Sequence, residues 1–130
     1  MSLVDPIADA LINIKNHETA SRKECRIRPA SKLLSEILGV MRANGYIGDY
    51  ERIDDGREGI FRITLLGKIN KCKAIKPRYA LKRNEFEKFE TRYLPSRDIG
   101  MLIVSTPQGV MTHRLAREKK IGGRLLAFIY

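Results

Sequence analysis

One stretch near the C-terminus, STPQGVMTHRLAREKK (residues 105–120), gathers side chains that could take part in chemistry. Ser105, Thr106 and Gln108 come first, and each can both donate and accept a hydrogen bond. Gly109 has no side chain, so a ligand could approach the backbone closely there. Cationic or ionisable groups follow at His113, Arg114, Arg117, Lys119 and Lys120. The residue types allow three hypotheses: a catalytic loop, a phosphate cradle for a nucleotide, or a surface for a polyanion.

The first two hypotheses lack their supporting patterns. Catalysis would make Ser105 a nucleophile and His113 its base, but the nucleophile elbow G-x-S-x-G is absent. The nucleotide-binding patterns G-x-x-x-x-G-K-[ST] and G-x-G-x-x-G are absent as well. Two dispersed histidines and two dispersed cysteines do not form a set of metal ligands. We therefore expect no enzymatic activity, no cofactor and no metal.

The charge distribution favours the third hypothesis. The net charge is +10, yet residues 1–66 hold ten Lys/Arg and ten Asp/Glu, whereas residues 67–130 hold fifteen and five. Such asymmetry indicates a polyanionic partner for the second half, although a solvated basic face would give the same count. Hydroxyls, an amide and cations together suit the sugar hydroxyls and phosphates of RNA. An ordinary turn, in which Ser105 and Thr106 serve local hydrogen bonds, fits these residues equally well.

Composition limits the class of protein. The chain has 130 residues, 43% of them hydrophobic, which suffices for a core in one domain or two small modules. No apolar run approaches the roughly 20 residues that span a bilayer. The N-terminal residues lack the basic region of a signal peptide, and Cys25 and Cys72 lack CxxC spacing. We expect a cytoplasmic protein with reduced thiols and no membrane contact.

The elements around this stretch are predicted to form an α+β fold of two small packed modules, residues 1–66 and 67–130. The first module follows the order α-β-α-β-β, with Asp5 capping a helix that begins at Pro6 and a hairpin through DDGRE (residues 54–58). The second follows β-α-β-β-α-β, with a first strand that Pro77 either confines to a sheet edge or ends. Asn84 is predicted to cap its first helix, and Thr112 its second, which should stop at Gly122 and Gly123.

Three blocks of the sequence resemble the small-subunit ribosomal protein S8 family. They are DPIADALINIKN (5–16), SKLLSEILGVMRANGYI (31–47) and STPQGVMTHRLAREKKIGG (105–123), and together they extend the similarity over essentially the whole chain. The resemblance implies a protein that binds the central domain of small-subunit ribosomal RNA and promotes subunit assembly. It also implies neighbouring ribosomal proteins as partners and, in some members, repression of the protein's own messenger RNA.

The resemblance also implies which residues contact RNA. The main motif falls on Ser105, Thr106 and the turn through Gly109, which includes Pro107 and Gln108. From the residue types of the predicted helix beside this turn, we add the following as RNA contacts: Thr112, His113, Arg114, Lys119 and Lys120. The lysine-rich segment, by its composition rather than by the resemblance, adds Lys76, Arg78, Tyr79, Lys82 and Arg83. The N-terminal contacts fall on Asp5, Pro6, Asn13, Lys15, Asn16, Ser31 and Lys32, of which Asp5 and Pro6 are already explained as helix-start residues.

Two positions depart from the bacterial pattern of the family. Pro107 and Gln108 replace a serine-containing turn, which is similar to the archaeal branch. A stacking aromatic of bacterial members aligns with Leu81, and Tyr79 is a candidate replacement. The alternative to RNA binding, from a different class, is a small basic module that binds an acidic protein partner.

Overall fold

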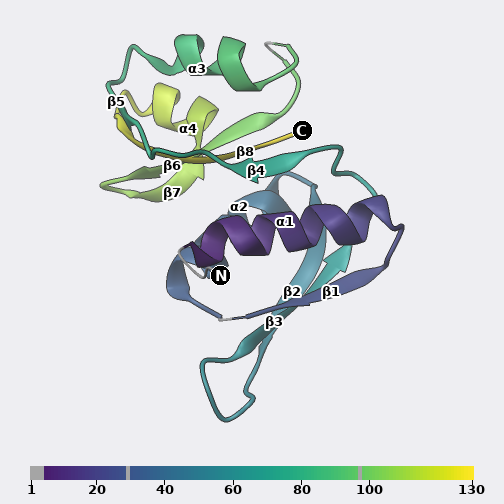
Figure 1. Ribbon diagram of the computed structural model, residues 1–130. Coiled ribbons are helices and arrows are strands. Elements are labelled where there is room, and N and C mark those ends of the chain that lie inside the picture. Colours follow the sequence, from purple (N-terminus) through teal and green to yellow (C-terminus); the bar gives the residue numbers. More distant parts are fainter. Residues whose placement is uncertain (1–4, 29, 97) are drawn as a thin grey trace. The chain divides into compact units, whose positions relative to one another are not determined.

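Figure 1 shows the computed structural model, which describes residues 5–28, 30–96 and 98–130. The chain divides into two compact units, Met1–Asn70 and Lys71–Tyr130. The division expected from the sequence lay between residues 66 and 67. Residues 67–70 group with the first unit, where the backbone N–H groups of Gly67 and Ile69 donate to the Glu18 carboxylate at 3.1 and 3.2 Å.

The first unit has the predicted order of two helices and three strands. Its elements are α1 (Pro6–Thr19), β1 (Glu24–Ile27), α2 (Lys32–Ala43), β2 (Ile47–Ile53) and β3 (Ile60–Leu65). The strands form an antiparallel sheet in the order β1-β3-β2, and the β2–β3 hairpin closes through residues 54–59. The mixed α+β class is confirmed.

Alternation of residue types places one face of this sheet in a core. Cys25 and Ile27 of β1 pair with Ile63 and Phe61 of β3, and all four side chains are buried. The residues between them are exposed, as expected for a sheet with one covered face. Both helices supply apolar side chains to the core of the unit: Ile7, Ala10, Leu11, Ile14, Leu34, Ile37, Leu38 and Met41.

Residues 71–96 and 98–130, the described part of the second unit, form seven helices and strands. They are β4 (Cys72–Ala74), β5 (Ala80–Leu81), α3 (Phe86–Tyr93), β6 (Met101–Thr106), β7 (Gly109–Thr112), α4 (His113–Glu118) and β8 (Gly123–Ile129). The sheet has the order β4-β8-β6-β7, with β5 paired to β8 as well, and every pairing is antiparallel. The long strand β8 therefore connects the lysine-rich segment to the β6–β7 hairpin.

The lysine-rich segment holds two short strands where the sequence predicted one. β4 pairs with the end of β8, at Ala127–Ile129, and β5 pairs with its beginning, at Gly123 and Arg124. Pro77 lies between them, where its missing N–H does not interrupt a ladder. Both strands are thus pieces of one edge, separated by residues 75–79.

Two predicted helix boundaries are wrong. Helix α3 begins at Phe86 after Glu85, and no side chain caps it, because the Glu85 carboxylate accepts instead from the N–H of Lys82 at 2.8 Å. Asn84 therefore does not cap. Helix α4 ends at Glu118, before the glycines, and Lys120 takes a left-handed conformation with φ of 57°.

Gly122 and Gly123 are required for another reason, the close approach of neighbouring strands. A Cβ on Gly122 would lie 2.1 Å from the carbonyl oxygen of Leu81, and one on Gly123 would lie 2.1 Å from that of Ser105. Only glycine lets β8 pass this closely between β5 and β6.

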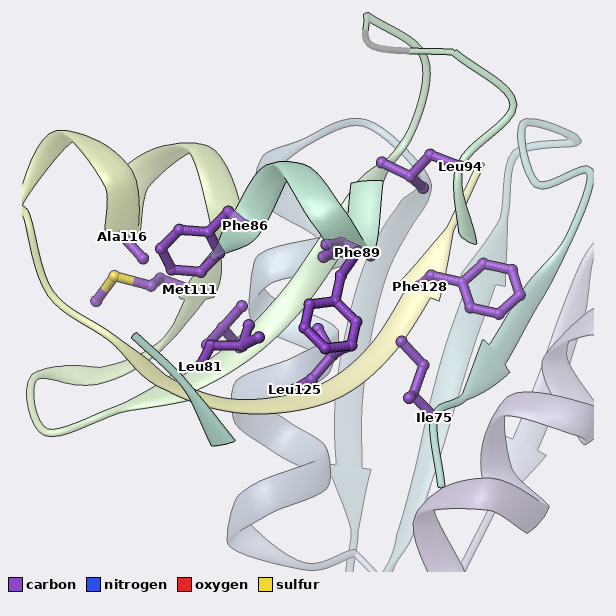
Figure 2. Packing of buried hydrophobic residues seen from close by; sticks show 11 residues of the cluster. Ile75, Leu81, Phe86, Phe89, Leu94, Met111, Ala116, Leu125 and Phe128 are labelled. Atoms are coloured by element: carbon purple, nitrogen blue, oxygen red, sulfur yellow. The ribbon is translucent and has the colours of Figure 1, made fainter. Parts of the chain in front are cut away.

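A hydrophobic cluster lies between the sheet and the two helices of the second unit. Figure 2 shows the ring of Phe89 pointing from α3 toward the sheet, and the ring of Phe86 beside Met111 and Ala116. The cluster also includes Ile75, Leu81, Leu94, Leu102, Val104, Leu125 and Phe128. Leu102 and Val104 show that the even-numbered positions of β6 face this core.

Candidate nucleic-acid interface

The β6–β7 turn is a two-residue connection with exposed residues at its tip. Ser105 pairs with Val110 and Thr106 with Gly109, which leaves Pro107 and Gln108 exposed between the strands. Gly109 has a φ of 116°, a conformation that side chains disfavour, and space around its α-carbon is open. The predicted tight turn is confirmed, and its glycine is required by the backbone as well as offering room for a ligand.

The hydroxyl of Thr106 is engaged inside the turn. It donates to the carbonyl oxygen of Gly109 at 2.7 Å and accepts from the N–H of Gln108 at 3.1 Å. Its side chain belongs to the core-facing side of β6, and only 9% of the residue is exposed. Thr106 therefore shapes the turn, the local role that the sequence left open for it.

Ser105 differs from Thr106, because successive side chains of a strand point to opposite faces. It is half-buried, and no described residue hydrogen-bonds its hydroxyl. Its direct neighbour on β8 is Arg124, which is exposed and pairs on its other side with Ala80 of β5. Paired residues share a face of the sheet, so a hydroxyl and a guanidinium group lie side by side away from the hydrophobic cluster.

Arg124 is a candidate site residue that the sequence did not reveal. Its guanidinium donates to the carbonyl oxygen of Arg78 at 3.4 Å, within the lysine-rich segment. In the sequence, the only hint of a role for Arg124 is that this cation begins the apolar strand RLLAFIY. The neighbours of Arg124 become visible only when β8 is seen to pair with both β5 and β6. Because β8 pairs with β5 on one side and with β6 on the other, Arg124 lies between residues 76–83 and the β6–β7 turn.

The lysine-rich segment presents cations around β5. Lys76, Arg78, Lys82 and Arg83 are all exposed. The ring of Tyr79 is half-buried, with its centroid 5.4 Å from that of Phe89, and the Arg92 guanidinium carbon lies 5.5 Å from the Tyr79 ring centroid. Leu81, the position aligned with the stacking aromatic, belongs to the hydrophobic cluster and cannot stack on a ligand.

Helix α4 carries the remaining predicted contacts of this unit. The Thr112 hydroxyl caps it by accepting from the N–H of Leu115 at 3.2 Å, as predicted. Arg114, Lys119 and Lys120 are exposed. The ammonium group of Lys119 donates to the amide oxygen of Gln108 at 3.2 Å, which ties the end of α4 to the tip of the turn.

His113 is a correction, because it does not lie at the surface. The residue is 0% exposed, and its Nδ1 accepts from the N–H of Leu102 at 3.0 Å. Burial lowers the pKa of the imidazole from 6.5 to about 4, against the opposing effect of the nearby Glu90 carboxylate. At neutral pH the side chain is therefore uncharged and supplies nothing to a phosphate. It also cannot serve Ser105 as a base, since its nitrogens face Leu102 and Glu90.

Arg117, the other cation expected on this helix, is paired. Its guanidinium group donates to the carboxylate of Glu90, which is buried with only 5% of the residue exposed. The guanidinium carbon also lies 6.0 Å from the ring centroid of Phe86. Arg117 is therefore engaged in an internal contact.

The predicted N-terminal contacts belong to the first unit, and three of them have structural roles. Asp5 Oδ1 accepts from the N–H groups of Ile7 and Ala8 at 3.0 and 3.2 Å, Pro6 occupies the first helical position, and the Ser31 hydroxyl caps α2. Asn13, Asn16 and Lys32 are exposed and Lys15 is half-buried. These last four side chains remain candidates for contact with a ligand.

The described part of the chain offers no metal site and no membrane span as an alternative. Among residues 5–28, 30–96 and 98–130, no three His, Cys, Asp or Glu side chains are grouped so that they could hold a metal ion. Within the same ranges, every helix is too short or too polar to cross a membrane.

An exposed cationic strand edge beside a hydrogen-bonding turn is an arrangement suited to RNA. A family model described as ribosomal protein S8 matches residues 5–130. The chain belongs to this family. This is a structural, non-enzymatic family, and the chain is accordingly a ribosomal protein that binds ribosomal RNA as a component of the small ribosomal subunit in the cytoplasm.

Proposed function

We propose that the second unit binds the central domain of small-subunit ribosomal RNA through the β6–β7 turn and the beginning of β8 beside it. The observation that carries the proposal is the juxtaposition of the Ser105 hydroxyl with the exposed Arg124. Ser105 can hydrogen-bond a sugar or a base edge, while Arg124 can contact a phosphate with a planar fork. Pro107, Gln108 and Gly109 form the tip that approaches the RNA.

The surrounding cations supply attraction that does not depend on sequence. Exposed cations lie on the lysine-rich segment, near the start of α4 and just after its end: Lys76, Arg78, Lys82, Arg83, Arg114, Lys119 and Lys120. Contacts of this kind position a protein on RNA, whereas the turn selects the site. In the first unit, Asn13, Lys15, Asn16 and Lys32 contribute secondary contacts.

Binding of this RNA would also account for a role in assembly of the subunit. A protein that holds a segment of this RNA in one shape fixes the surface on which neighbouring ribosomal proteins then bind. The same surface would recognise the protein's own messenger RNA if that messenger presented the same shape. Competition between the messenger and the ribosomal RNA fragment tests this extension.

Footprinting on complete small-subunit ribosomal RNA is the most direct test. Protection should map to the central domain, and Ser105→Ala and Arg124→Met should each lower affinity for that fragment by about 1–3 kcal/mol. Arg26→Met is the matched control, since Arg26 is an exposed strand arginine in the first unit. Equal affinity for target and scrambled RNA would favour the alternative of an acidic protein partner.

A further inference from the structure

A buried polar cluster lies directly behind the proposed interface, and the contacts described for RNA do not use it. It consists of Glu90 on α3 with His113 and Arg117 on α4. Glu90 and His113 are 5% and 0% exposed, and Nε2 of His113 lies 3.3 Å from Oε1 of Glu90. Burying a carboxylate is costly even when it is paired, so such a cluster is poor at adding stability. Its geometry indicates what it does instead.

We propose that Glu90, His113 and Arg117 form a positioning cluster that holds α4, and through α4 the β6–β7 turn, in the arrangement that binds RNA. The inference rests on the proposed function of that turn. None of the three side chains is required to touch RNA.

The first argument is that α4 has few other anchors. It has six residues, too few to be stable as an isolated helix. Only His113 and Ala116 are buried along it, and Leu115 is 40% exposed. The pairing of Arg117 with Glu90, beside which Nε2 of the neutral His113 lies 3.3 Å from the same carboxylate oxygen without a hydrogen bond, is therefore a large part of what fixes α4 against α3.

The second argument is that His113 joins three elements at one point. It is the first residue after β7, whose last paired residue, Thr112, lies opposite Ile103. After that pair the chain leaves the sheet and begins α4. The next N–H of β6, that of Leu102, therefore has no strand residue to pair with, and it donates to Nδ1 of His113 instead. With Nδ1 accepting, the neutral imidazole carries its proton on Nε2, facing Glu90.

The third argument is a continuous path from the cluster to the tip of the turn. Arg117 binds Glu90 at the inner side of α4, and two residues later Lys119 donates to the side chain of Gln108 at 3.2 Å. A shift of α4 would move Lys119 and with it Gln108. Precise placement of a binding site depends on such supporting contacts.

The test compares three single variants of the full chain, with the central-domain RNA fragment and a scrambled RNA of equal length as probes. Arg117→Lys keeps the charge but loses the planar fork, and its side chain is 43% exposed, so the variant should fold. Glu90→Gln removes the buried charge. Glu87→Gln is the control, because Glu87 is exposed on the same helix and its replacement changes the net charge equally.

We expect Arg117→Lys and Glu90→Gln to weaken target binding by about fivefold or more. Affinity for scrambled RNA should depend on net charge alone. It should therefore be the same in Arg117→Lys as in wild type, and the same in Glu90→Gln as in Glu87→Gln. The salt dependence of Arg117→Lys should equal that of wild type, since the substitution removes no cation that binds a phosphate. The effects of Arg117→Lys and Gln108→Ala should not add in the double variant, because both act through the turn.

Wild-type target affinity in folded Arg117→Lys, or full additivity with Gln108→Ala, would overturn the proposal. Should the variants fail to fold, the wild-type protein supplies the deciding measurement. Its nitrogen-detected NMR spectrum should show the His113 proton on Nε2, and a proton on Nδ1 would overturn the cluster. If wild type itself does not prefer the target RNA, the proposed function fails rather than this inference.

Discussion

The two units treat their charged side chains in opposite ways. In the first, opposite charges pair across the surface: Arg42 lies 2.9 Å from Asp49, and Arg62 pairs with Glu51. In the second unit, fourteen Lys/Arg face five Asp/Glu. Two of those five acids are also engaged internally, since Glu85 accepts from the backbone of Lys82 and Glu90 is buried.

If the proposed function holds, this difference separates a unit with secondary contacts from the main binding surface. A unit whose charges balance needs no outside partner to satisfy them, whereas an excess of +9 on about sixty residues repels itself until a polyanion neutralises it. A related contrast appears among hydroxyl groups, and it lies within the second unit as well as between the units. Ser31 and Thr106 have their hydroxyls bound to backbone groups, while Ser105 has no such partner among the described residues.

The largest expected effect tests how tightly the second unit is built around the turn. Gly123→Ala would force a Cβ to within 2.1 Å of the Ser105 carbonyl oxygen, so we expect a loss of at least about 3 kcal/mol in the free energy of unfolding. Gly56→Ala in the first unit is the control. Its positive φ costs about 1 kcal/mol, and no atom lies within 4 Å of the new methyl group. Urea titrations measure both, and similar losses would contradict the close approach.

A second effect concerns acid. The folded pKa of His113, about 4, lies below its ordinary value of 6.5, so as pH falls the unfolded chain binds a proton before the folded one does. This contribution to stability is complete above pH 6.5 and is lost between pH 6.5 and 4, up to about 3 kcal/mol. The groups acting on His113 are Glu90 on α3, Arg114 and Arg117 on α4, and the Leu102 N–H on β6.

The measurement compares unfolding free energies at pH 7 and 4.5 in wild type and in His113→Gln. Wild type should lose more stability than the variant, because the variant has no imidazole to protonate. An equal loss in both would show that His113 is not buried as described.

Local sequence signals predicted those features that depend only on nearby residues. Asp5 and Pro6 at the start of α1, Thr112 at the start of α4, and the two-residue turn after Thr106 were all recognisable, because caps and turns are satisfied within a few positions. The strand β5 gave no such signal, since two residues cannot show a period.

Features that depend on tertiary packing were missed. Nothing near His113 in the sequence indicates burial, because its partner Glu90 lies on a different helix and Leu102 on a different strand. Arg124 was hidden for a similar reason, since its neighbours are set by the register of β8. Local chemistry identified the turn, and packing decided which of its side chains face outward.

A third prediction compares the removal of the Ser105 hydroxyl with the removal of the Thr106 hydroxyl. Ser105→Ala should lower RNA affinity by about 1–3 kcal/mol and leave the melting temperature nearly unchanged. Thr106→Val should do the reverse, losing about 1–2 kcal/mol of stability because Gly109 and Gln108 lose their partner. Thermal melts and RNA titrations on both variants check this. The opposite assignment of effects would mean that Thr106 faces the RNA.

The smallest expected effect compares equal charge changes in the two units. Replacing Lys119 and Lys120 with glutamine should flatten the slope of log K against log salt by up to about 0.9 for each phosphate that the protein no longer neutralises. Arg22 and Lys23, exposed in the first unit, provide the matched double replacement. Both variants lose two charges, so a long-range effect of net charge would alter both slopes equally. If Lys119 and Lys120 bind phosphates directly, their replacement should change the slope more than the replacement of Arg22 and Lys23 does. Equal changes in the two variants would mean that Lys119 and Lys120 do not contact the RNA.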